Sequence, residues 1–299
     1  GLERATSGRI LVENEDVTLL PATDRDVSMV FQSYALFPHM SVLENVSYGL
    51  KMINVPKEEF TEKSLETLKL VNLEGYENRM PSELSGGQQQ RVAVARAIVL
   101  KPKVLLFDEP LSNLDAKLRR QVREDIREIQ QKLGVTTIYV THDQEEALAI
   151  SDKVIVMNNA IIAQQGSPKE LYNFPKTKFV ANFIGDANVV KAKIINQNNN
   201  VYEIQLAEMK INIKSDQKLE SSVSVSLRPE KITISKSPEE NSIHASVNNA
   251  SFVGNSYQYI VNSKVGKIYV VSSDTNEIFN VGENVYLNFD EKELRLLDD

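Results

Sequence analysis

Two acidic residues follow an apolar stretch that predicts a buried strand. Val104–Phe107 is apolar throughout, and Asp108 and Glu109 come directly after it. In α/β proteins the carboxyl ends of such strands form the edge of the sheet where ligands bind. Asp108 therefore has the chemistry of a Mg²⁺ ligand, and Glu109 that of a group that orients or deprotonates a water molecule. Considered alone, a strand that ends in solvated acids explains the pattern equally well.

A histidine and a glutamine follow two other apolar stretches. His142 comes after Thr136–Val140, with one predicted helix between this stretch and the acidic pair, and Gln32 comes after Val27–Val30. A histidine at a strand end is more often a structural residue than a reactive one. The amide of Gln32 is uncharged, but it can hold a water molecule or ligate Mg²⁺. Each of these signals is weak by itself, and a solvated loop explains Gln32 as well.

A run of small and polar residues precedes a helical pattern. Ser85 is suited to cap the helix, Gly86 and Gly87 allow a close approach to its first N–H groups, and Gln88 follows them. A helix N-terminus with exposed N–H groups favours anions. An ordinary helix cap is the alternative, although the full run Leu-Ser-Gly-Gly-Gln-Gln-Gln-Arg is far more specific than a lone Ser-Gly-Gly. Asp115 is likewise predicted to cap the helix that follows it.

Strands and helices alternate up to about Gly185, which predicts a parallel sheet with crossover helices. The helix over Ala116–Leu133 is indicated by apolar residues at spacings of three and four, with charged residues between them. It lies between the stretches Val104–Phe107 and Thr136–Val140. Two further apolar stretches, 153–157 and 161–165, flank the turn signal Asn158-Asn159.

After Gly185 the pattern changes to short alternating strands, which favour a small all-β barrel or sandwich. Asn196–Asn200 is predicted to be a polar turn. The predicted strands are Val201–Leu206, Met209–Ile213, Val223–Leu227, Tyr257–Val261, Lys267–Val271 and Asn284–Phe289.

Composition excludes several classes of protein. The chain has 299 residues, a net charge of −7 and no cysteine, so it forms no disulfide, thiol nucleophile or thiolate metal site. The acidic balance argues weakly against a general nucleic-acid binder. No apolar run is long enough to span a membrane, and the chain opens with no signal-peptide pattern.

Taken together and in this order, the motifs closely resemble the ATP-binding-cassette (ABC) transporter ATPases. The resemblance covers residues 1–184, with a helical subdomain at about residues 37–88. It implies ATP and Mg²⁺ as cofactors, with Asp108 and Gln32 near the metal. It further implies that Glu109 polarises the attacking water and that His142 contacts the γ-phosphate. Gln32 would sense Mg²⁺ and the attacking water. The signature turn Ser85–Gln88 and Asp115 would face ATP held by a second subunit.

The β-rich part, residues 185–299, resembles the oligonucleotide-binding-like (TOBE-type) regulatory domain of importer ATPases. Its run Leu227-Arg228-Pro229-Glu230-Lys231 is the feature that carries this resemblance. Importers of this type transport maltose, polyamines or ferric iron. The linker Ile184–Asn188 and the stretch Leu111–Leu133 look most similar to ferric-iron importers, with polyamine and phosphonate importers close behind.

One departure from the family concerns the phosphate-binding loop. No Gly-x-x-x-x-Gly-Lys-[Ser/Thr] motif occurs in the sequence. The chain therefore resembles a cassette that lacks its first strands and P-loop, and we expect it to be inactive as an ATPase. We also expect the uncovered sheet edge to make the chain poorly stable or self-associating. The alternative is a catalytically inactive fragment or a regulatory module whose function lies in residues 185–299.

The resemblance also implies partners and a location. Two ATPase subunits would form a homodimer on transmembrane permease subunits, at the inner face of the cell membrane, and a substrate-binding protein would deliver the cargo. Phe37–Ser41 would dock on the permease, although an ordinary surface loop is the alternative. No nucleic-acid partner is expected. A chromosome-maintenance ATPase shares the signature turn, but Gln32 and Leu84 are too close in sequence to enclose its long coiled coil.

Overall fold

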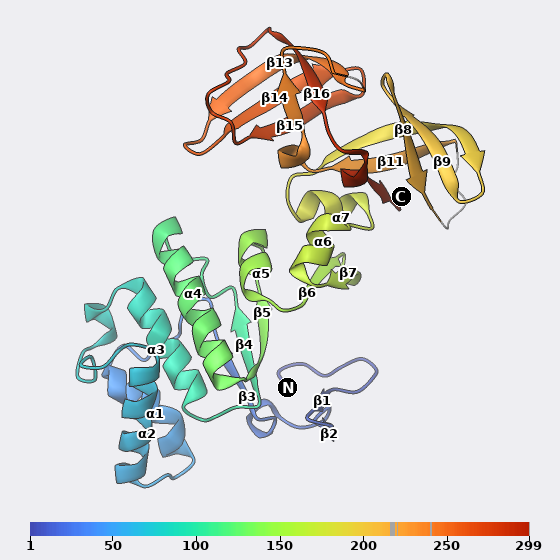
Figure 1. Cartoon of the computed structure of the whole chain (residues 1–299). Coiled ribbons are helices and arrows are strands. Elements are labelled where there is room, and N and C mark those ends of the chain that lie inside the picture. The colour runs from blue at the N-terminus through green and yellow to red at the C-terminus, as the bar shows by residue number, and fades with distance from the viewer. Residues whose placement is uncertain (216–218, 220, 240, 299) are drawn as a thin grey trace. The chain divides into compact units, whose positions relative to one another are not determined.

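The computed structural model describes residues 1–215, 219, 221–239 and 241–298 (Figure 1). The remaining positions all fall within the predicted second domain, 185–299, and lie outside the described residues. The chain divides into two compact units, Gly1–Ser151 and Asp152–Asp299. Residues 152–184 thus pack with the second unit, although the periodicity of the sequence changes only near Gly185. The domain limits at residues 184 and 185 stay a prediction.

The N-terminal unit contains a parallel sheet in the order β3-β4-β5. Val30 lies beside Phe107, and Asp108 lies beside Val140, so the polar residues after these strands meet at one edge. The helix between β4 and β5, α4, confirms the predicted crossover. The bounds are β3 (Val27–Val30), β4 (Val104–Asp108), α4 (Ala116–Leu133) and β5 (Thr136–Val140).

The other helices of the N-terminal unit pack on one side of this sheet and on one another (Figure 1). Ser41 caps the first of them through a reciprocal pair of hydrogen bonds with Glu44. The helices are α1 (Val42–Met52), α2 (Lys57–Leu70), α3 (Gly86–Ile98) and α5 (Gln144–Ile150), with 3-10 turns η1 (Ala22–Asp24) and η2 (Pro81–Glu83) and a small hairpin of β1 (Leu11–Val12) and β2 (Glu15–Asp16).

The two faces of the parallel sheet differ in burial. Leu105 and Phe107 are buried and join a core that α1, α3 and α4 complete. On β5 the alternate residues Ile138 and Val140 are 55% and 52% exposed. Successive side chains of a strand point to opposite faces, so one face of β5 carries apolar surface toward solvent.

The C-terminal unit begins with a hairpin and two short helices. The hairpin turns at Asn159-Ala160, one residue later than the predicted Asn158-Asn159, because Asn158 is still in the strand and pairs with Ile161; a register shift follows Val156. Ser167 and Thr177 cap the two helices with their side-chain oxygens. The elements are β6 (Val154–Asn158), β7 (Ile161–Gly166), α6 (Pro168–Asn173) and α7 (Lys178–Phe183).

Two antiparallel sheets follow, and they share one core. They curl in the manner of oligonucleotide-binding folds, which confirms the predicted all-β domain. Within the described residues, one sheet has the order β10-β9-β8-β11-β17 and the other β12-β16-β13-β14-β15. Their bounds are β8 (Asn188–Asn198), β9 (Val201–Leu206), β10 (Met209–Lys214), β11 (Ser222–Leu227), β12 (Thr233–Ser235), β13 (Ile243–Phe252), β14 (Tyr257–Ser263), β15 (Gly266–Ser272), β16 (Asn284–Asn288) and β17 (Arg295–Leu297), with 3-10 turns η3 (Pro229–Lys231) and η4 (Glu291–Glu293).

The predicted turn at Asn196–Asn200 is only partly a turn. Strand β8 continues to Asn198, and only Asn199 and Asn200 form the turn, with Asn199 at a φ of 52°. Asparagine tolerates this left-handed conformation better than most residues. Polar residues extend the strand here because this end of β8 is exposed on both faces.

Arg228 connects the two helices to the β-sheets of the C-terminal unit. Its guanidinium group is buried and donates to the carbonyl oxygens of Tyr172, Ala181 and Gly185, with the bonds to Tyr172 at 3.0 and 2.6 Å and the bond to Ala181 at 3.1 Å. The guanidinium also lies 4.0 Å from the centre of the Tyr172 ring. Tyr172 in turn donates to Glu230 at 2.7 Å. The Leu-Arg-Pro-Glu-Lys run therefore joins β11 to α6 and α7.

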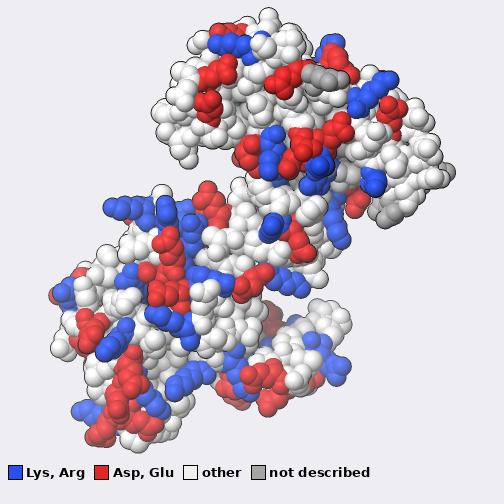
Figure 2. Space-filling model, viewed as in Figure 1, with Lys and Arg blue, Asp and Glu red and all other residues white. Residues whose placement is uncertain are grey.

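The charged side chains are mixed in sign on the face that Figure 2 shows. Among the described residues, no helix is long and apolar enough to cross a membrane. Lys and Arg side chains alternate with Asp and Glu side chains over the face of each unit that Figure 2 shows.

Candidate functional site

The ends of β4 and β5 bring a carboxylate and an imidazole into contact. Glu109 Oε1 lies 3.1 Å from His142 Nδ1. The side chain of His142 is 71% exposed and that of Glu109 is 32% exposed, so the pair opens to solvent at the edge of the sheet. The geometry suits a carboxylate that accepts a proton and an imidazole that donates a hydrogen bond to an anion.

The backbone of Glu109 has an unusual conformation. Its φ is +43°, in the left-handed region that residues with a Cβ rarely adopt. Its N–H donates to the carbonyl of Val140 at 3.0 Å, which extends the strand ladder by one residue. Such strained positions cluster at functional sites, where the surrounding structure holds them. Asp108, the preceding residue, is exposed at the last position of β4.

The contact with Glu109 raises the pKa of His142 above the ordinary value for histidine. The hydrogen bond to Glu109 is the main cause, and the negative charge of Glu109 acts in the same direction. Both effects favour the imidazolium form. The contact with Glu109 therefore favours the positively charged form of His142, which is the form that attracts anions.

Gln32 joins the same group through Ser112. Gln32 Nε2 donates to Ser112 Oγ at 3.0 Å, and Ser112 Oγ donates to the carbonyl of Glu109 at 3.0 Å. Asn113 Nδ2 also donates to the carbonyl of Gln32 at 3.0 Å. The hydrogen bond to Ser112 uses the amide nitrogen of Gln32, so its side-chain oxygen is the atom suited to a metal or a water. The structure thus brings Gln32, Glu109 and His142 into one continuous group.

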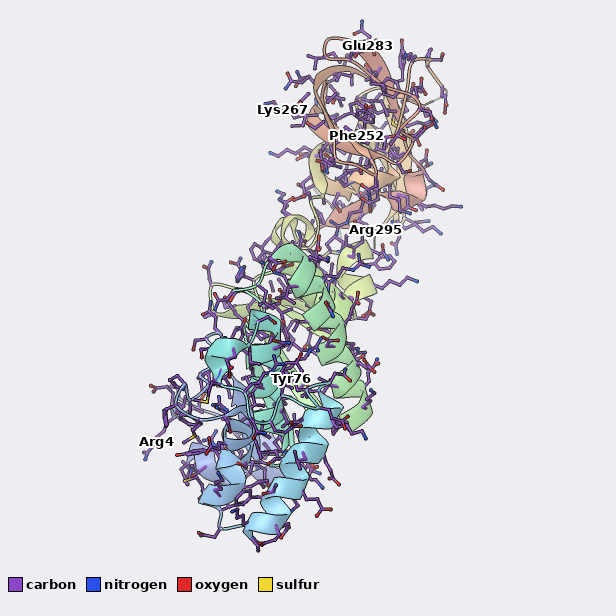
Figure 3. The ribbon with its side chains drawn as sticks, turned by 90° about the vertical axis from the view of Figure 1, so that its left-hand side faces the viewer. Arg4, Tyr76, Phe252, Lys267, Glu283 and Arg295 are labelled. Atoms are coloured by element: carbon purple, nitrogen blue, oxygen red, sulfur yellow. The ribbon has the colours of Figure 1, made fainter. Side chains whose placement is uncertain are left out.

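The signature turn forms a helix cap at the start of α3. Ser85 Oγ accepts from the N–H of Gln88 at 3.4 Å, and Gln88 Oε1 accepts from the N–H of Ser85 at 2.9 Å. Gln88 Nε2 also donates to the hydroxyl of Tyr76 at 3.2 Å; Figure 3 labels this tyrosine. The side chains of Ser85 and Gln88 therefore hold the turn together. The cap uses the N–H of Gln88, and of the two glycines before it Gly86 is partly exposed and Gly87 is buried.

The two glycines of the turn have a packing requirement. A Cβ on Gly87 would lie 2.8 Å from Leu118 Cδ1, and one on Gly86 would lie 3.1 Å from Leu114 Cδ2. Contacts under 3.0 Å are incompatible with ordinary packing, so α3 approaches the start of α4 more closely at Gly87 than a side chain allows.

Asp115 caps α4, as predicted. Its Oδ1 accepts from the N–H groups of Lys117 and Leu118 at 3.1 and 3.0 Å. Asp115 and the signature turn belong to the α3–α4 contact, whereas Gln32, Glu109 and His142 belong to the strand ends. The segment Glu109–Asp115 links these two groups along the chain.

Two contributors were not predicted from the sequence. Ser112 was not singled out as a site residue, yet its hydroxyl connects Gln32 to Glu109. Glu146 was not singled out at all, yet its carboxylate is buried and accepts from Tyr139 and Thr141, which precede His142. A glutamate next to another glutamate at a helix start gives no sequence signal that one of them is buried.

The candidate site fits Mg²⁺ bound to a nucleotide better than a free metal ion. No group of three or more His, Asp or Glu side chains in the described part of the chain is arranged to hold a metal. Mg²⁺ usually binds one or two protein ligands and takes the rest from waters and phosphates. Asp108 and the side-chain oxygen of Gln32 are donors of the kind such a shared site uses, while His142 suits the anion.

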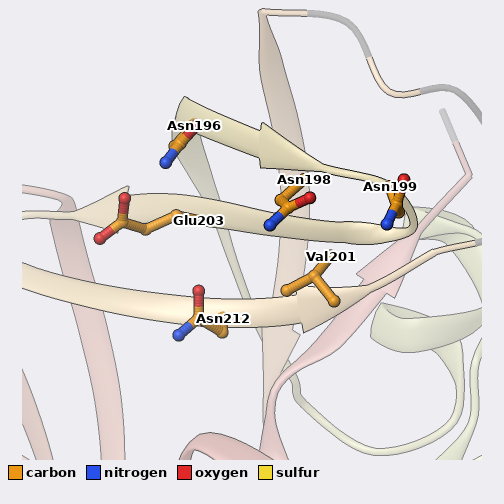
Figure 4. A pocket seen from close by; sticks show the side chains of 6 residues that line it. All are labelled: Asn196, Asn198, Asn199, Val201, Glu203 and Asn212. Atoms are coloured by element: carbon orange, nitrogen blue, oxygen red, sulfur yellow. The ribbon is translucent and has the colours of Figure 1, made fainter.

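A polar hollow of about 560 Å³ lies in the C-terminal unit, on the outer part of β8, β9 and β10 (Figure 4). It is open to solvent, and none of the candidate site residues contributes to it. Its lining consists of Asn196, Asn198, Asn199, Val201, Glu203 and Asn212.

Comparisons with known proteins agree with this arrangement. The family model described as ABC transporter matches residues 1–112, and the TOBE domain model matches residues 225–297. The chain is 49% identical over 298 residues to the "Fe(3+) ions import ATP-binding protein FbpC" of Agrobacterium fabrum, covering all of this chain and 84% of that protein. The protein of the same name from Photorhabdus laumondii is 47% identical, with 96% of this chain and 80% of that protein covered.

A solved structure extends the likeness to three dimensions. The cbiO1 protein of Clostridium perfringens, described as part of the ABC transporter complex cbiONQ, is 32% identical with a TM-score of 0.53. The alignment covers 57% of this chain and 70% of that protein. The motifs, the strand-end geometry and these relatives agree, and the resemblance found in the sequence is confirmed. The chain therefore belongs to the ABC transporter family, as an ATP-binding cassette followed by a TOBE domain.

Proposed function

We propose that this protein is the energy-coupling ATPase subunit of an importer of ferric iron. The contact between Glu109 and His142 is the observation that carries the ATPase part of the proposal. The names of relatives that are 49% and 47% identical support iron as the cargo. Polyamine and phosphonate remain the competing cargoes, because the cassette does not touch the transported molecule.

The strand-end residues have complementary roles in this proposal. Mg²⁺–ATP, when bound, supplies the γ-phosphoryl group and neutralises part of its charge. Glu109 polarises the attacking water, and its contact with His142 keeps the carboxylate oriented. His142, with its raised pKa, donates a hydrogen bond to a γ-phosphate oxygen. Asp108 and Gln32 face the metal, and Ser112 keeps Gln32 fixed relative to Glu109.

The signature turn and Asp115 act on a nucleotide held by a second subunit. The cap at Ser85 uses the N–H of Gln88, so an anion would approach the start of α3 at the partly exposed Gly86, and the close packing at Gly87 fixes α3 on α4. A homodimer would therefore place the turn of each subunit opposite the strand-end residues of the other.

The loop after Gln32 is the proposed docking segment for the permease. Asn45, fully buried, accepts from the N–H of Phe37 at 2.8 Å and donates to the carbonyls of Phe37, Met40 and Ser41 at 3.0 to 3.1 Å. Arg96 donates to the carbonyls just before the loop, at residues 34 and 35. A rigid loop next to Gln32 is suited to couple the site to a membrane partner, so the subunit would work at the inner face of the membrane.

The chain as printed is not expected to hydrolyse ATP at a useful rate. The printed sequence has no P-loop motif, whose N–H groups and lysine hold the β- and γ-phosphates. Loss of one well-placed donor to a transition-state charge costs roughly 10²- to 10³-fold in rate, and a P-loop supplies several. Mg²⁺-dependent phosphate release is the assay. Turnover near ~1 per second that disappears in Glu109→Gln would contradict this expectation.

Iron uptake tests the proposed function as a whole. The full-length protein from the gene that encodes this chain is expressed, with its permease, in cells lacking their own ferric importer. The unsubstituted protein is expected to restore uptake of radioactive Fe³⁺, and Glu109→Gln is expected to abolish it. Glu145→Gln, at an exposed glutamate near the site, is the matched control. Uptake of a polyamine or a phosphonate instead of iron would overturn the proposed cargo.

A further inference from the structure

The buried carboxylate of Glu146 is unexplained by the roles described so far. Glu146 lies in the first turn of α5 and is 3% exposed, whereas its neighbour Glu145 is exposed. Burying a carboxylate is costly unless hydrogen bonds or opposite charges compensate for the lost water. Its two hydrogen-bond donors therefore identify what this residue holds in place.

Both donors bond to the same oxygen atom of Glu146. The hydroxyl of Tyr139, on β5, donates to Glu146 Oε2 at 3.1 Å, and Thr141 Oγ1 donates to Oε2 at 2.9 Å. Thr141 directly precedes His142. The helix α5 and the end of β5 are thus joined at one acceptor atom.

The residue after His142 is fixed by the same group of side chains. The N–H of Asp143 donates to Thr141 Oγ1 at 2.9 Å, and Asp143 Oδ1 accepts from the N–H groups of Glu145 and Glu146 at 2.8 and 3.3 Å. Both neighbours of His142 are therefore held by side-chain hydrogen bonds, although His142 itself is 71% exposed.

We propose that Glu146 is a positioning residue that holds His142 in contact with Glu109 through its acceptor oxygen Oε2. It touches neither nucleotide nor metal, and it acts through Thr141 and Tyr139. Its importance for ATP hydrolysis rests on the proposed function, while its effect on the position of His142 does not. The charges that face this group are those of Asp143, of Arg119, which pairs with Asp143 at 3.4 Å, of Arg123, which acts on Tyr139, and of Glu109.

Because both hydroxyls bond to the same oxygen of Glu146, two substitutions separate the effect of these hydrogen bonds from the effect of the charge. The side-chain oxygen of a glutamine can accept both hydroxyls, so Glu146→Gln keeps the two hydrogen bonds and removes the charge. Glu146→Ala removes both. Glu145→Ala is the matched control, because it removes an exposed carboxylate from the same helix turn.

The readout is the Nδ1–H proton of His142 in a histidine-labelled sample of the chain. At one fixed pH between the ordinary pKa values of glutamate and histidine, a hydrogen bond to the Glu109 carboxylate gives a downfield proton resonance with slowed exchange. Its absence in His142→Gln assigns the resonance. The measurement requires no ATPase activity.

The resonance is expected in the unsubstituted chain, in Glu145→Ala and in Glu146→Gln, and it is expected to disappear in Glu146→Ala. If the resonance persists in Glu146→Ala, the proposal is wrong. If the resonance is lost in Glu146→Gln, the negative charge of Glu146 rather than its acceptor oxygen holds His142, and the proposal in this form is also wrong. If Glu146→Ala gives no native amide spectrum, Thr141→Val replaces it and is expected to speed exchange several-fold. Unchanged exchange in Thr141→Val would also overturn the proposal. Iron uptake by Glu109→Gln, by contrast, would overturn the proposed function and leave the positioning result standing.

Discussion

The two units bury their sheets in different ways. In the C-terminal unit, both antiparallel sheets contribute to one core, and residues such as Ile204 and Val261 are fully buried. In the N-terminal unit, helices cover only one face of the parallel sheet, and the other face exposes Ile138 and Val140 on β5. The C-terminal unit therefore has a self-sufficient core, whereas the sheet that carries the candidate site presents apolar surface of the kind that marks interaction.

The largest effect is expected at Arg228, whose bonds complete the C-terminal unit. Arg228→Ala leaves the buried carbonyls of Tyr172, Ala181 and Gly185 without their donor, and we expect a loss of about 3 kcal/mol in the opening free energy of β8 and β11. Arg228→Lys keeps the charge but not the planar fork, so it should recover less than half of this loss. Native-state hydrogen exchange provides the measurement. Lys191→Ala, on the exposed side of β8, is the control. A similar loss of opening free energy in Arg228→Ala and Lys191→Ala would contradict the role assigned to the bonds of Arg228.

Asn45 should be the most sensitive polar residue of the N-terminal unit. Asn45→Ala removes the acceptor of the Phe37 N–H and the amide nitrogen whose two hydrogens are shared among three carbonyls of the loop 37–41. We expect the opening free energy of α1 and α3 to fall by about 2 kcal/mol. Exchange of the amides in α1 and α3 reports the loss. Asn78→Ala, at an exposed asparagine, should leave these rates within error, and equal effects of the two substitutions would contradict the assigned role.

The two signature glycines should differ in their tolerance of a methyl group. Gly87→Ala forces Leu118 to move and is expected to cost about 1.5 kcal/mol, because overpacking outweighs the gain in helix propensity. Gly86→Ala meets a looser contact and should be close to neutral. Urea unfolding monitored by circular dichroism separates the two variants. An equal cost at both positions would contradict the close approach of α3 to α4 at Gly87.

The exposed apolar face of β5 should govern self-association. Ile138→Lys and Val140→Lys place charges on the exposed face of an edge strand, which opposes pairing between chains. Light scattering over a range of concentrations is expected to show a smaller average mass for these variants than for the unsubstituted chain. Ile204 lies in the closed core of the other unit, so Ile204→Val is the contrasting substitution and should leave the mass unchanged. If the unsubstituted chain and all variants are monomers at every concentration, the exposed face of β5 does not cause self-association and the contrast between the two units is wrong on this point.

The smallest effect concerns the charge of His142. Its pKa in the folded chain is raised, so the pair with Glu109 stabilises the fold fully below the ordinary histidine pKa of about 6.5 and loses this contribution as pH rises through the folded value. Nuclear magnetic resonance titration should show a higher pKa for His142 than for the same residue in Glu109→Gln. Identical titration of His142 in both proteins would mean that the contact does not form in solution.

Much of the fold could be predicted from the periodicity of apolar residues in the sequence. The strand β5 and the helix α4 match their predicted bounds because each has one clear period and a distinct end. The long strands β8 and β13 were not predicted, since polar residues interrupt their alternation and both carry a register shift. Each of these strands is paired on both edges, with the next strand along the chain and with a more distant one, and this pairing keeps the segments extended.

The candidate site was predictable in its members but not in its connections. The strand-end positions of Glu109 and His142 followed from the parallel sheet, and the sequence resemblance supplied their roles. The bridge through Ser112 and the burial of Glu146 depend on side-chain directions that spacing does not encode. Their roles in catalysis stay predictions for the experiments above.

The short strand β17 has a consequence for how the C-terminal unit folds. It pairs with β11, and Arg295, labelled in Figure 3, donates to the carbonyl of Asn173, which lies 122 residues earlier in the sequence. Closing so long a loop costs chain entropy before the contacts that compensate for it have formed. Folding is slower when contacts join residues that are distant in sequence. Docking of β17 is therefore expected to be a late kinetic step, and until it occurs one edge of β11 stays open to pairing with other chains.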